Sequence, residues 1–354
     1  MSTSHPDKDE HDDAERKACI QVEHGFHIRH PPPPHELHPS ITDDDHLFQT
    51  IHMGSAVVDL CAWRLVVTGL VQQPLTLTFK ELTSLPCKTV TSFHECYGPP
   101  GVPPIKNYWR VGNVQWTGMP LRDLLARVSP LPSAKYVWSD SLDYGTFKGI
   151  SSDRYQKDLP LSKALSDEVL IAYLMNGEPL SKERGWPARL LVPGWFGTNS
   201  TKWLSKLSLQ AERSKSHYTT TWYNELDPTD PDGKRMRPVW NVEPNSIIVR
   251  PKPHEVMPGR EVHVEGWSWS CDAVAAVEIS LDSGKTWQGT QVERRTDYSW
   301  QKFRVILRLP EGLHTLIARA TCMSGAKQPL SGRRNYVHSV TFSVGHKRAY
   351  ANNY

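Results

Sequence analysis

The pattern of hydrophobic residues changes near residue 240, and this change limits the chain to two structurally different halves. From about 41 to 212, apolar strand-like runs such as 63–71 and 189–195 alternate with short helical stretches such as 120–128. Beyond 240, apolar residues recur at every second position, and turn residues separate the runs. Period two is that of a half-buried β-strand. The sequence therefore predicts an α+β chain, with a mixed α+β domain followed by an all-β immunoglobulin-like sandwich.

This division predicts five segments along the 354 residues. A flexible arm rich in Pro and His spans 1–40, and a polar, Pro-rich linker spans 213–239. The mixed domain occupies 41–212, the sandwich 240–346 and a short tail 347–354. Hydrophobic residues make up 38% of the chain, which is enough for a core in each domain.

Composition argues against several classes of function. The formal charge is +3 and Lys and Arg form no clustered stripes, so we expect no nucleic-acid partner. No apolar run approaches the roughly 20 residues of a membrane helix. The acidic N-terminal residues lack a signal core and disfavour a mitochondrial presequence, so we expect a soluble, cytoplasmic protein. The six cysteines lack CxxC spacing, which argues against a zinc knuckle, a disulfide framework or a CxxCH haem site.

Cys96 is the cysteine whose surroundings suggest chemistry. It follows an apolar strand-like run and precedes a Gly/Pro-rich turn in 91–100, so we expect its sulfur at a strand end facing a cleft. Position alone leaves other interpretations open. A free cysteine is often a small buried hydrophobe. A nucleophilic cysteine would need a histidine partner, and His94 is close in the chain without being placed in space.

A set of segments in order carries a resemblance to a known family: 63–71, 91–100, 110–125, 170–180, 185–197, 201–204, 264–270, 277–287, 318–320 and 328–329. Through them the chain resembles the sulfite oxidase and nitrate reductase family from about residue 42 to 345. The resemblance implies a molybdopterin-binding domain followed by the family's immunoglobulin-like dimerisation domain. It also implies a homodimer with an isologous interface.

The resemblance implies the cofactor Mo-molybdopterin, with the Cys96 thiolate as the protein's ligand to molybdenum, a metal suited to soft sulfur ligands. The pterin carries a phosphate, which requires cations and hydrogen-bond donors. Arg189 and Lys202 match the family's cofactor-binding Arg and Lys. Ser200 and Thr201 match its other contacts on the phosphate side.

Three further positions match cofactor contacts less directly. His52 corresponds to the His that ends an Arg-Asn-His motif near the pterin. Asp143 lies where the family keeps a pterin-contacting Asp, although Asp140 competes for that assignment. Arg184 replaces the first His of an HGxPxR motif; it retains the ability to bind phosphate but cannot accept a hydrogen bond.

The substrate pocket is where the chain departs from the family. Thr50 stands where the Arg-Asn-His motif has Arg, and the residues after Cys96 lack the usual Asn and Arg. Arg110 is a substitute cation, and Trp109 matches the pocket Trp. Tyr223 aligns with the Tyr at the molybdenum-oxygen face.

A second-half arginine completes the predicted pocket. Arg334, with Arg333 beside it, lies where the family's second domain sends an Arg into the pocket. A charged turn at the sandwich edge is the alternative interpretation of this pair.

The resemblance implies oxygen-atom transfer that oxidises a small oxyanion, sulfite, to sulfate. We expect no haem or flavin in this chain, so electrons would leave to a separate acceptor: a cytochrome, a small carrier or oxygen. Two alternatives stay open. The altered pocket suits another sulfur or nitrogen oxide with the same cofactor, or the chain is a non-catalytic dimeric scaffold that retains the fold.

Overall fold

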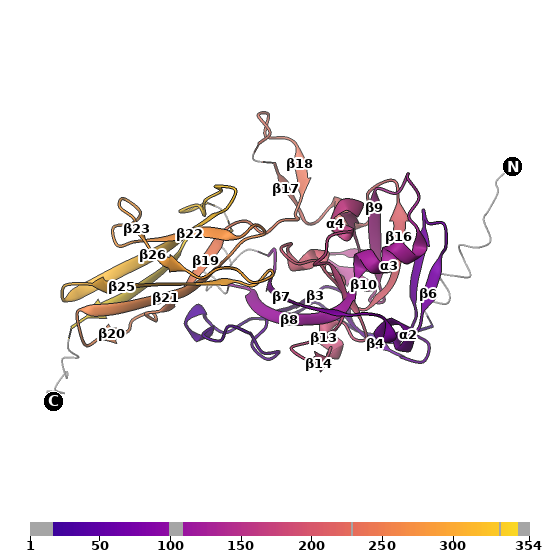
Figure 1. The fold of residues 1–354 in the computed structure, drawn as a ribbon, viewed down its shortest axis with the longest axis horizontal. Helices are drawn as coiled ribbons and strands as arrows, with labels where there is room; N and C mark the ends of the chain where they lie inside the picture. The colour runs from indigo at the N-terminus through magenta and orange to yellow at the C-terminus, as the bar shows by residue number, and fades with distance from the viewer. Residues whose placement is uncertain (1–16, 99–108, 228, 333, 346–354) are drawn as a thin grey trace.

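The computed structural model describes residues 17–98, 109–227, 229–332 and 334–345. Figure 1 shows two domains side by side along the longest axis, a mixed domain and a β-sandwich. The predicted α+β class is confirmed, with most regular structure in strands. No helix in these residues is long and apolar enough to cross a membrane.

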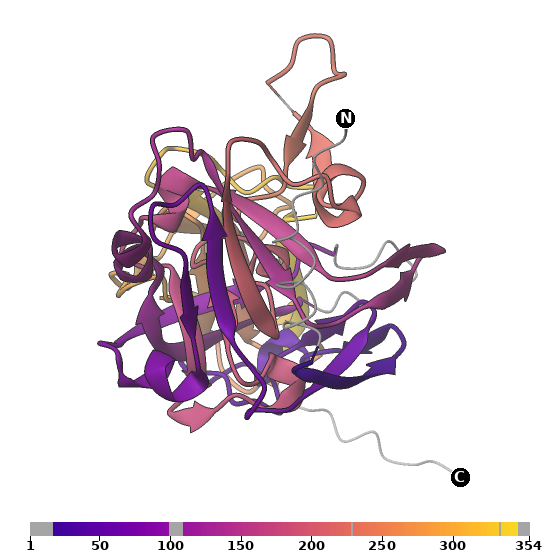
Figure 2. The same ribbon diagram turned by 90° about the vertical axis from the view of Figure 1, so that its right-hand side faces the viewer.

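Two sheets build the first domain. Its strands are β5 (Leu65–Gly69), β6 (Leu75–Leu77), β7 (Lys88–Glu95), β8 (Val111–Pro120), β9 (Tyr136–Ser141), β12 (Gln156–Pro160), β13 (Leu170–Met175), β14 (Glu178–Pro179), β15 (Arg189–Leu191) and β16 (Leu204–Gln210). One sheet has the order β12-β9-β16-β5-β6, in which β16 and β5 are parallel. The other has the order β14-β13-β8-β7, with β15 also paired to β13. Figure 2 looks onto this domain and shows the strands of both sheets stacked around its core.

Short helices close the ends of these sheets. They are α2 (Phe79–Ser84), α3 (Leu121–Val128), α4 (Leu161–Ala164) and α5 (His217–Thr220), with 3-10 turns η1 (Pro34–Glu36), η2 (Lys182–Arg184) and η3 (Gly197–Asn199). Apolar residues of α3 recur at helical spacing and are buried: Leu121, Leu124, Leu125 and Val128. One face of α3 therefore packs into the core of the first domain.

The second domain is a sandwich of two sheets, as predicted. Its strands are β19 (Asn245–Arg250), β20 (Val256–Met257), β21 (Glu261–Trp269), β22 (Val274–Ser280), β23 (Gln288–Gly289), β24 (Gln291–Val292), β25 (Gln301–Arg308), β26 (Gly312–Cys322) and β27 (His338–Val344). The sheet orders are β19-β21-β25-β24 and β20-β27-β26-β22-β23. In β21, Val262 and Val264 are buried while Glu261 and His263 are exposed. This alternation is the period-two pattern of the sequence.

The N-terminal segment differs from its prediction. We expected a flexible arm over 1–40, but residues 17–40 are built into the fold. β1 (Cys19–His24) pairs with β4 (Gly54–Val58), and β2 (His27–Arg29) pairs with β3 (Gln49–Ile51). The prediction is wrong for these residues because their partner strands, β3 and β4, lie beyond the Pro-rich stretch, and local composition gives no sign of this pairing. Residues 1–16 lie outside the described residues.

The stretch after η1 touches both domains. Leu37 is buried, and its carbonyl accepts a hydrogen bond from the Trp267 indole at 2.6 Å. The carbonyl of Ser40 accepts from Asn113 in the first domain (2.7 Å) and from the Trp300 indole in the second (3.0 Å). The segment therefore fastens one domain to the other.

A cluster of buried apolar residues joins the domains: Leu37, Phe93, Trp109, Val111, Phe196, Val239, Val242, Ile247, Val249, Trp267, Trp269 and Trp300. Its members come from the N-terminal segment, from β7 and β8, and from the second domain. A continuous apolar core of this kind favours one fixed arrangement of the two domains.

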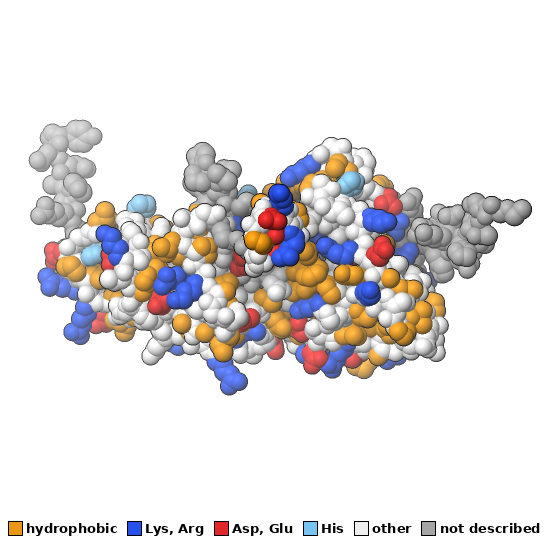
Figure 3. All heavy atoms as spheres, turned by 90° about the horizontal axis from the view of Figure 1, so that it is seen from above, with side chains coloured by type: hydrophobic (Ala, Val, Ile, Leu, Met, Phe, Trp, Pro, Cys, Tyr) orange, Lys and Arg blue, Asp and Glu red, His pale blue; other side chains and the backbone are white. Residues whose placement is uncertain are grey.

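The predicted linker, 213–239, contains regular structure of its own. β17 (Asn224–Leu226) and β18 (Met236–Pro238) form a hairpin that stands away from the body in Figures 1 and 2. A second projecting hairpin is β10 (Gly145–Phe147) with β11 (Ile150–Ser152). On the face shown in Figure 3, basic and acidic side chains are interspersed over both domains, as the small net charge suggests.

Candidate active site

A cavity lies in the first domain, lined by apolar, polar and charged side chains. Its lining brings together residues from the β3–β4 region, the ends of β7 and β9, and the η2 and η3 turns: Leu47, Phe48, Gln49, Thr50, Ile51, His52, His94, Cys96, Tyr97, Ser141, Asp143, Tyr155, Glu183, Arg184, Arg189, Gly197, Thr198, Ser200, Lys202, Trp203 and Tyr223. Most of the predicted site residues are in this set, although they are spread over 172 positions of the sequence from His52 to Tyr223.

Cys96 lies directly after β7 and lines the cavity, as expected for a strand-end thiol. Its N–H donates to the Arg110 carbonyl at 2.9 Å, which continues the β7–β8 pairing. Its Sγ is 3.7 Å from the Thr50 hydroxyl oxygen. The residue therefore lines the cavity wall, and it also packs against the buried apolar cluster that contains Leu47 and Phe48.

His94 lies on the same side of β7 as Cys96, because strand residues two apart share a face. Its ring stacks on Phe48 with centroids 5.6 Å apart. Burial lowers its pKa well below the usual value, with Arg189 adding to the effect, so the imidazole is neutral. The thiol's hydrogen-bonding neighbour within the described chain is Thr50, not His94. This geometry does not assemble a Cys-His nucleophile.

Arg189 and Lys202 place positive charge in the cavity wall with few partners. Arg189 donates to the carbonyls of Arg184 (3.1 Å) and Ser200 (3.0 Å), and its buried Nε has no partner. Lys202 donates to the carbonyls of Thr50 (3.2 Å) and Glu183 (3.0 Å). Burial lowers the pKa of Arg189 to about 9 and that of Lys202 well below its usual value, and neighbouring cations add to both shifts. Such a site stabilises a bound anion.

Ser200 and Thr201 have different surroundings. Ser200 lines the cavity, and its hydroxyl oxygen accepts from the Val192 N–H at 3.1 Å. The Thr201 hydroxyl is buried against Ser139 at 2.8 Å and is not part of the cavity wall. In this geometry Thr201 secures the backbone, and Ser200 is the one of the two that faces a ligand.

Arg184 is held by the protein more fully than the other two cations. Its guanidinium donates to the Asp44 carboxylate and to the carbonyls of Phe48 (2.7 Å), Leu47 (2.8 Å) and Asp44 (2.7 Å). Four donor positions are thus used inside the protein. Arg184 orders the segment before β3, and its positive charge still adds to the field at Arg189 and Lys202.

His52 and Tyr223 form a direct pair across the cavity. Burial and the charge of Lys202 lower the pKa of His52 to about 3, so its ring is neutral, and Nε2 shares a hydrogen bond with the Tyr223 hydroxyl. Burial raises the pKa of Tyr223, and proximity to Cys96 raises it further, so the phenol keeps its proton. The pair thus holds one transferable proton beside the thiol.

Asp143, rather than its competitor Asp140, lines the cavity. Burial raises the pKa of the Asp143 carboxyl to about 6, although the Ser141 hydroxyl donates to it. Asp140 instead pairs with Arg154 at 3.2 Å and accepts from Gln156 at 2.7 Å. The geometry therefore favours Asp143 as the cofactor contact.

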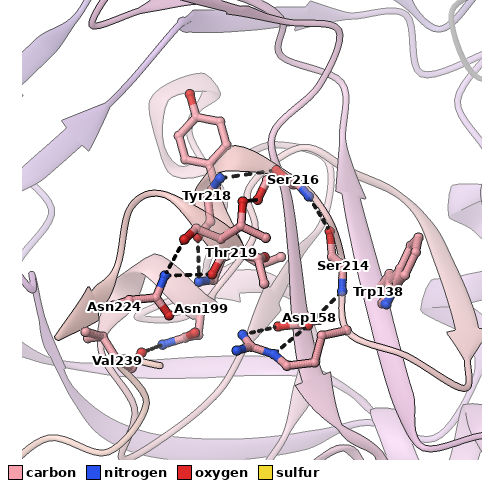
Figure 4. Close-up of polar contacts among 12 residues, drawn as sticks. Trp138, Asp158, Asn199, Ser214, Ser216, Tyr218, Thr219, Asn224 and Val239 are labelled. Carbon is pink, nitrogen blue, oxygen red and sulfur yellow. Dashed lines mark hydrogen bonds and ion pairs between the residues drawn. The ribbon is translucent and has the colours of Figure 1, made fainter. Parts of the chain in front are cut away.

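The segment that carries Tyr223 is pinned by polar contacts that Figure 4 shows. The Asp158 carboxylate accepts from the Arg213 guanidinium (3.0 and 3.1 Å) and from the Ser214 N–H (2.9 Å). The Ser214 hydroxyl accepts from the Ser216 N–H (3.1 Å), and the Ser216 hydroxyl caps α5 at Tyr218 (3.3 Å). These contacts anchor α5 against β12.

Lys157, beside Asp158 on β12, is a buried group that the sequence did not single out. Its Nζ donates to the Tyr218 carbonyl at 2.8 Å and lies 5.5 Å from the centre of the Tyr223 ring. Burial lowers its pKa to about 7. Tyr223 itself has a φ of 59°, an uncommon value for a residue with a side chain. Lys157 therefore contacts the segment 218–223 at both ends, at the Tyr218 carbonyl and at the Tyr223 ring.

Trp109 and Arg110 flank Cys96 without lining the cavity. Trp109 is buried in the interdomain core, with Tyr336 and His338 rings 6.1 and 6.0 Å away. Arg110 lies against the backbone after Cys96, since a Cβ placed on Gly98 would be 2.1 Å from its Nη2. Arg110 is therefore at the edge of the site, and Trp109 is not brought to the cavity.

Arg334 reaches from the second domain toward the same loop. Its guanidinium stacks over Phe196 (3.9 Å) and Tyr97 (4.7 Å) and pairs with Glu243 at 3.2 Å. A second-domain arginine thus approaches the cavity as predicted, and the Tyr97 ring, which lines the cavity, contacts its guanidinium. Its companion Arg333 lies outside the described residues.

Tyr155 is a cavity residue that sequence reasoning missed. Its hydroxyl donates to the Thr198 carbonyl at 2.6 Å, and its ring stacks 5.6 Å from His52. No motif marks it, because its position depends on a loop between β11 and β12. His94 had a usable signal: two residues before Cys96 on a strand, it must share the cysteine's face.

Comparisons with known proteins agree with this geometry. The oxidoreductase molybdopterin binding domain matches residues 52–218, and the Mo-co oxidoreductase dimerisation domain matches 236–342. Sulfite oxidase of Arabidopsis thaliana is 30% identical over 273 residues, which cover 70% of this chain and 69% of the plant protein. The chain belongs to the sulfite oxidase family. Its two matched regions are the family's oxidoreductase molybdopterin binding domain and its Mo-co oxidoreductase dimerisation domain.

Other family members extend the comparison. Human mitochondrial sulfite oxidase is 30% identical over 329 residues, which cover 85% of this chain and 59% of the human protein. The chain thus spans less than two thirds of that relative's length. The sulfane dehydrogenase SoxCD from Paracoccus pantotrophus has a similar structure, with a TM-score of 0.77 and 26% identity over 96% of this chain and 92% of that one.

The cavity fits the family's cofactor in two respects. A half-buried thiol faces the cavity, where a soft metal can take it as a ligand. Arg189 has a buried Nε without a hydrogen-bond partner, and Lys202 donates to two carbonyls and lies over the Trp203 ring, so neither cation has an acidic hydrogen-bond partner within the described residues and both can bind a phosphate. Together, the thiol and the two cations are the groups that a metal-bound, phosphate-bearing cofactor requires.

Proposed function

We propose that this chain binds Mo-molybdopterin in the Cys96 cavity and oxidises sulfite to sulfate, delivering electrons to a separate acceptor. The observation that supports the proposal is that the Cys96 thiol lines the same cavity as Arg189 and Lys202, two cations whose hydrogen bonds within the described residues go to backbone carbonyls. A scaffold without a cofactor would gain stability by losing such buried cations.

When bound, the cofactor supplies two-electron oxygen-atom transfer. Cys96 would hold the metal, and Arg189, Lys202 and Ser200 would hold the phosphate. Tyr223 and neutral His52 would keep one proton between the phenol oxygen and Nε2, beside the thiol. Arg110, at the edge of the site, would attract an anionic substrate.

The test uses protein expressed in a host that makes the cofactor. We expect about one molybdenum per chain by metal analysis and sulfite-dependent reduction of ferricyanide or ferricytochrome c. Molybdenum far below one atom per chain would favour a non-catalytic scaffold. Full loading without sulfite turnover would move the assignment to another substrate.

One specific observation favours a second substrate class, a more reduced sulfur compound. Thr50 occupies the cavity wall 3.7 Å from the Cys96 sulfur, where the family's motif has an arginine. The resemblance to a sulfane dehydrogenase points in the same direction. Parallel assays with sulfite and with sulfane-sulfur compounds on the loaded protein separate the two.

We also propose that the second domain forms a homodimer. The match to the dimerisation domain over 236–342 supports this, and interfaces of closed dimers are isologous. Light scattering of the purified chain tests it, with a monomer mass as the contrary result.

A further inference from the structure

Cys96 follows β7, an edge strand of its sheet, and a loop of the second domain pairs with the outer edge of β7. β7 is the last strand of its sheet, and its other neighbour is a loop of the second domain around Tyr298. The Phe93 N–H donates to the Tyr298 carbonyl at 2.9 Å, and the Tyr298 N–H donates to the Thr91 carbonyl at 3.0 Å. This loop extends the sheet by a parallel bridge at Ser92. The second domain thereby acts as an extra strand.

Glu95, the residue before Cys96, also contacts the second domain, through its side chain. Glu95 is buried, and both of its carboxylate oxygens accept from the second domain: Oε1 from the Asn245 amide at 3.2 Å and Oε2 from the Trp269 indole at 2.7 Å. A carboxylate at a strand end, with both oxygens fixed, leaves the next residue little freedom.

These contacts continue into the sandwich interior. Asn245 Oδ1 accepts from the Gln328 amide at 3.1 Å, and Gln328 Oε1 accepts from the Ser246 hydroxyl at 2.7 Å. Both partners are buried. Glu95 is therefore attached to the second domain's own core network, not to a loose surface group.

We infer that the second domain, besides dimerising, positions the Cys96 thiol through the contacts of Glu95 with Trp269 and Asn245. Glu95 and Trp269 are positioning residues. They touch neither the cavity nor its contents, and they act by fixing the end of β7. The inference rests on the proposed function only in that it takes Cys96 to be the metal-binding thiol.

β21 offers a matched pair of substitutions. Trp269 and Trp267 are both buried, both lie on β21, and both donate an indole N–H across the domain boundary. Trp269 bonds to Glu95, beside Cys96, whereas Trp267 bonds to the Leu37 carbonyl in the N-terminal segment. Trp269→Phe and Trp267→Phe therefore remove equivalent interactions, and the first of them is the one next to the thiol.

The measurement is the alkylation rate of Cys96 in the full chain without cofactor, followed by iodoacetamide labelling and peptide mass spectrometry. We expect Trp269→Phe to raise the rate about tenfold, since loss of a buried hydrogen bond to a carboxyl group shifts a local opening equilibrium by about that factor. Trp267→Phe should leave it within about twofold of the unsubstituted chain. Cys322, buried in the sandwich, reports general unfolding and should label slowly in every sample.

Glu95→Gln is the second variant, used alone if Trp269→Phe does not fold. The amide retains one acceptor oxygen and the same shape, so we expect a smaller rise in Cys96 labelling than with Trp269→Phe. In loaded samples, both variants should also hold less molybdenum than Trp267→Phe.

The inference is overturned if Cys96 labels at the unsubstituted rate in Trp269→Phe and Glu95→Gln, or if Trp267→Phe accelerates it equally. A parallel rise at Cys322 overturns it too, because the effect would then be global. Failure of the proposed function gives a different result: the unsubstituted chain lacks molybdenum while the labelling contrast between the two tryptophans persists.

Discussion

The two domains bury charged groups in different ways. In the first domain, Arg189 and Lys157 are buried and Lys202 is partly buried, and all three have backbone carbonyls as their hydrogen-bond acceptors. In the second domain, a charge such as that of Arg319 keeps some exposure and is paired, with Glu278 at 3.0 Å. Unpaired buried charge costs stability, whereas paired charge at a sheet surface costs little. The difference indicates that the first domain accepts a cost in folding free energy at a ligand site, whereas the second domain does not.

The largest expected effect is at the thiol of the first domain. Cys96→Ser should abolish turnover and leave the fold intact, because a serine oxygen is a harder ligand than a thiolate. Molybdenum content, turnover and circular dichroism are the measurements. Cys61→Ser, at an exposed cysteine, is the control and should behave like the unsubstituted chain. Near-normal turnover of Cys96→Ser would refute the assignment of Cys96 as the metal ligand and of the first domain as the site of the reaction.

The next effect is on stability and comes from Lys157. Its folded pKa of about 7 is below the usual 10.5, so the unfolded chain binds more protons between those values. The contribution of Lys157 to stability should therefore be fully present above pH 10.5 and fall as pH drops toward 7, by at most about 5 kcal/mol, since each pKa unit corresponds to about 1.4 kcal/mol. Lys157→Met should lose this part of the pH dependence, to which Lys202 also contributes, and be more stable at pH 7.

Urea unfolding at pH 7 and pH 9.5 measures the slope. Lys135→Met, at an exposed lysine of the same domain, should keep it. Turnover of Lys157→Met should fall, because the Tyr218 carbonyl and the Tyr223 ring lose their support. A slope in Lys157→Met as steep as in the unsubstituted chain would assign it to other groups.

Lys202→Met should change cofactor retention and stability in opposite directions. Cofactor binding should weaken by about tenfold to a hundredfold through loss of a charge-assisted contact. The cofactor-free protein should become more stable by about 1 kcal/mol or more, because a buried cation is removed. Lys182→Met, which breaks a half-exposed pair with Glu23, should do neither. Equal losses of both properties would make Lys202 a structural residue.

The smallest effect belongs to the second domain. Arg319→Gln removes an ion pair and a stack over Trp287 at 3.8 Å, and should cost about 1 kcal/mol or less. Molybdenum content and turnover should not change. Thermal unfolding and metal analysis check this, and a loss of molybdenum would show that the sandwich surface influences the cavity.

The sequence anticipated much of this arrangement where the signal is local. Alternating residues such as Val262 and Val264 identify the sandwich because strand period is visible within a few residues. Family motifs identified the cavity residues Cys96, Lys202 and Tyr223 because each motif carries its own spacing. The sandwich and the family are confirmed, whereas the roles of the site residues stay predictions.

What the sequence could not predict depends on contacts between distant segments. Leu37 was assigned to a flexible arm because its partner, Trp267, lies 230 positions away. Arg184 was treated as a phosphate ligand without sight of Asp44, which takes up its guanidinium. Lys157 has no motif, and its burial follows from how α5 packs on β12.

The N-terminal segment has a consequence for how the molecule is made. The Ser40 carbonyl accepts from the Trp300 indole, which is synthesised 260 residues later. Leu37 has its partner, Trp267, 230 residues later. This segment can therefore complete its contacts only after the second domain is made, and nascent chains stalled before the sandwich would expose it to chaperones and proteases.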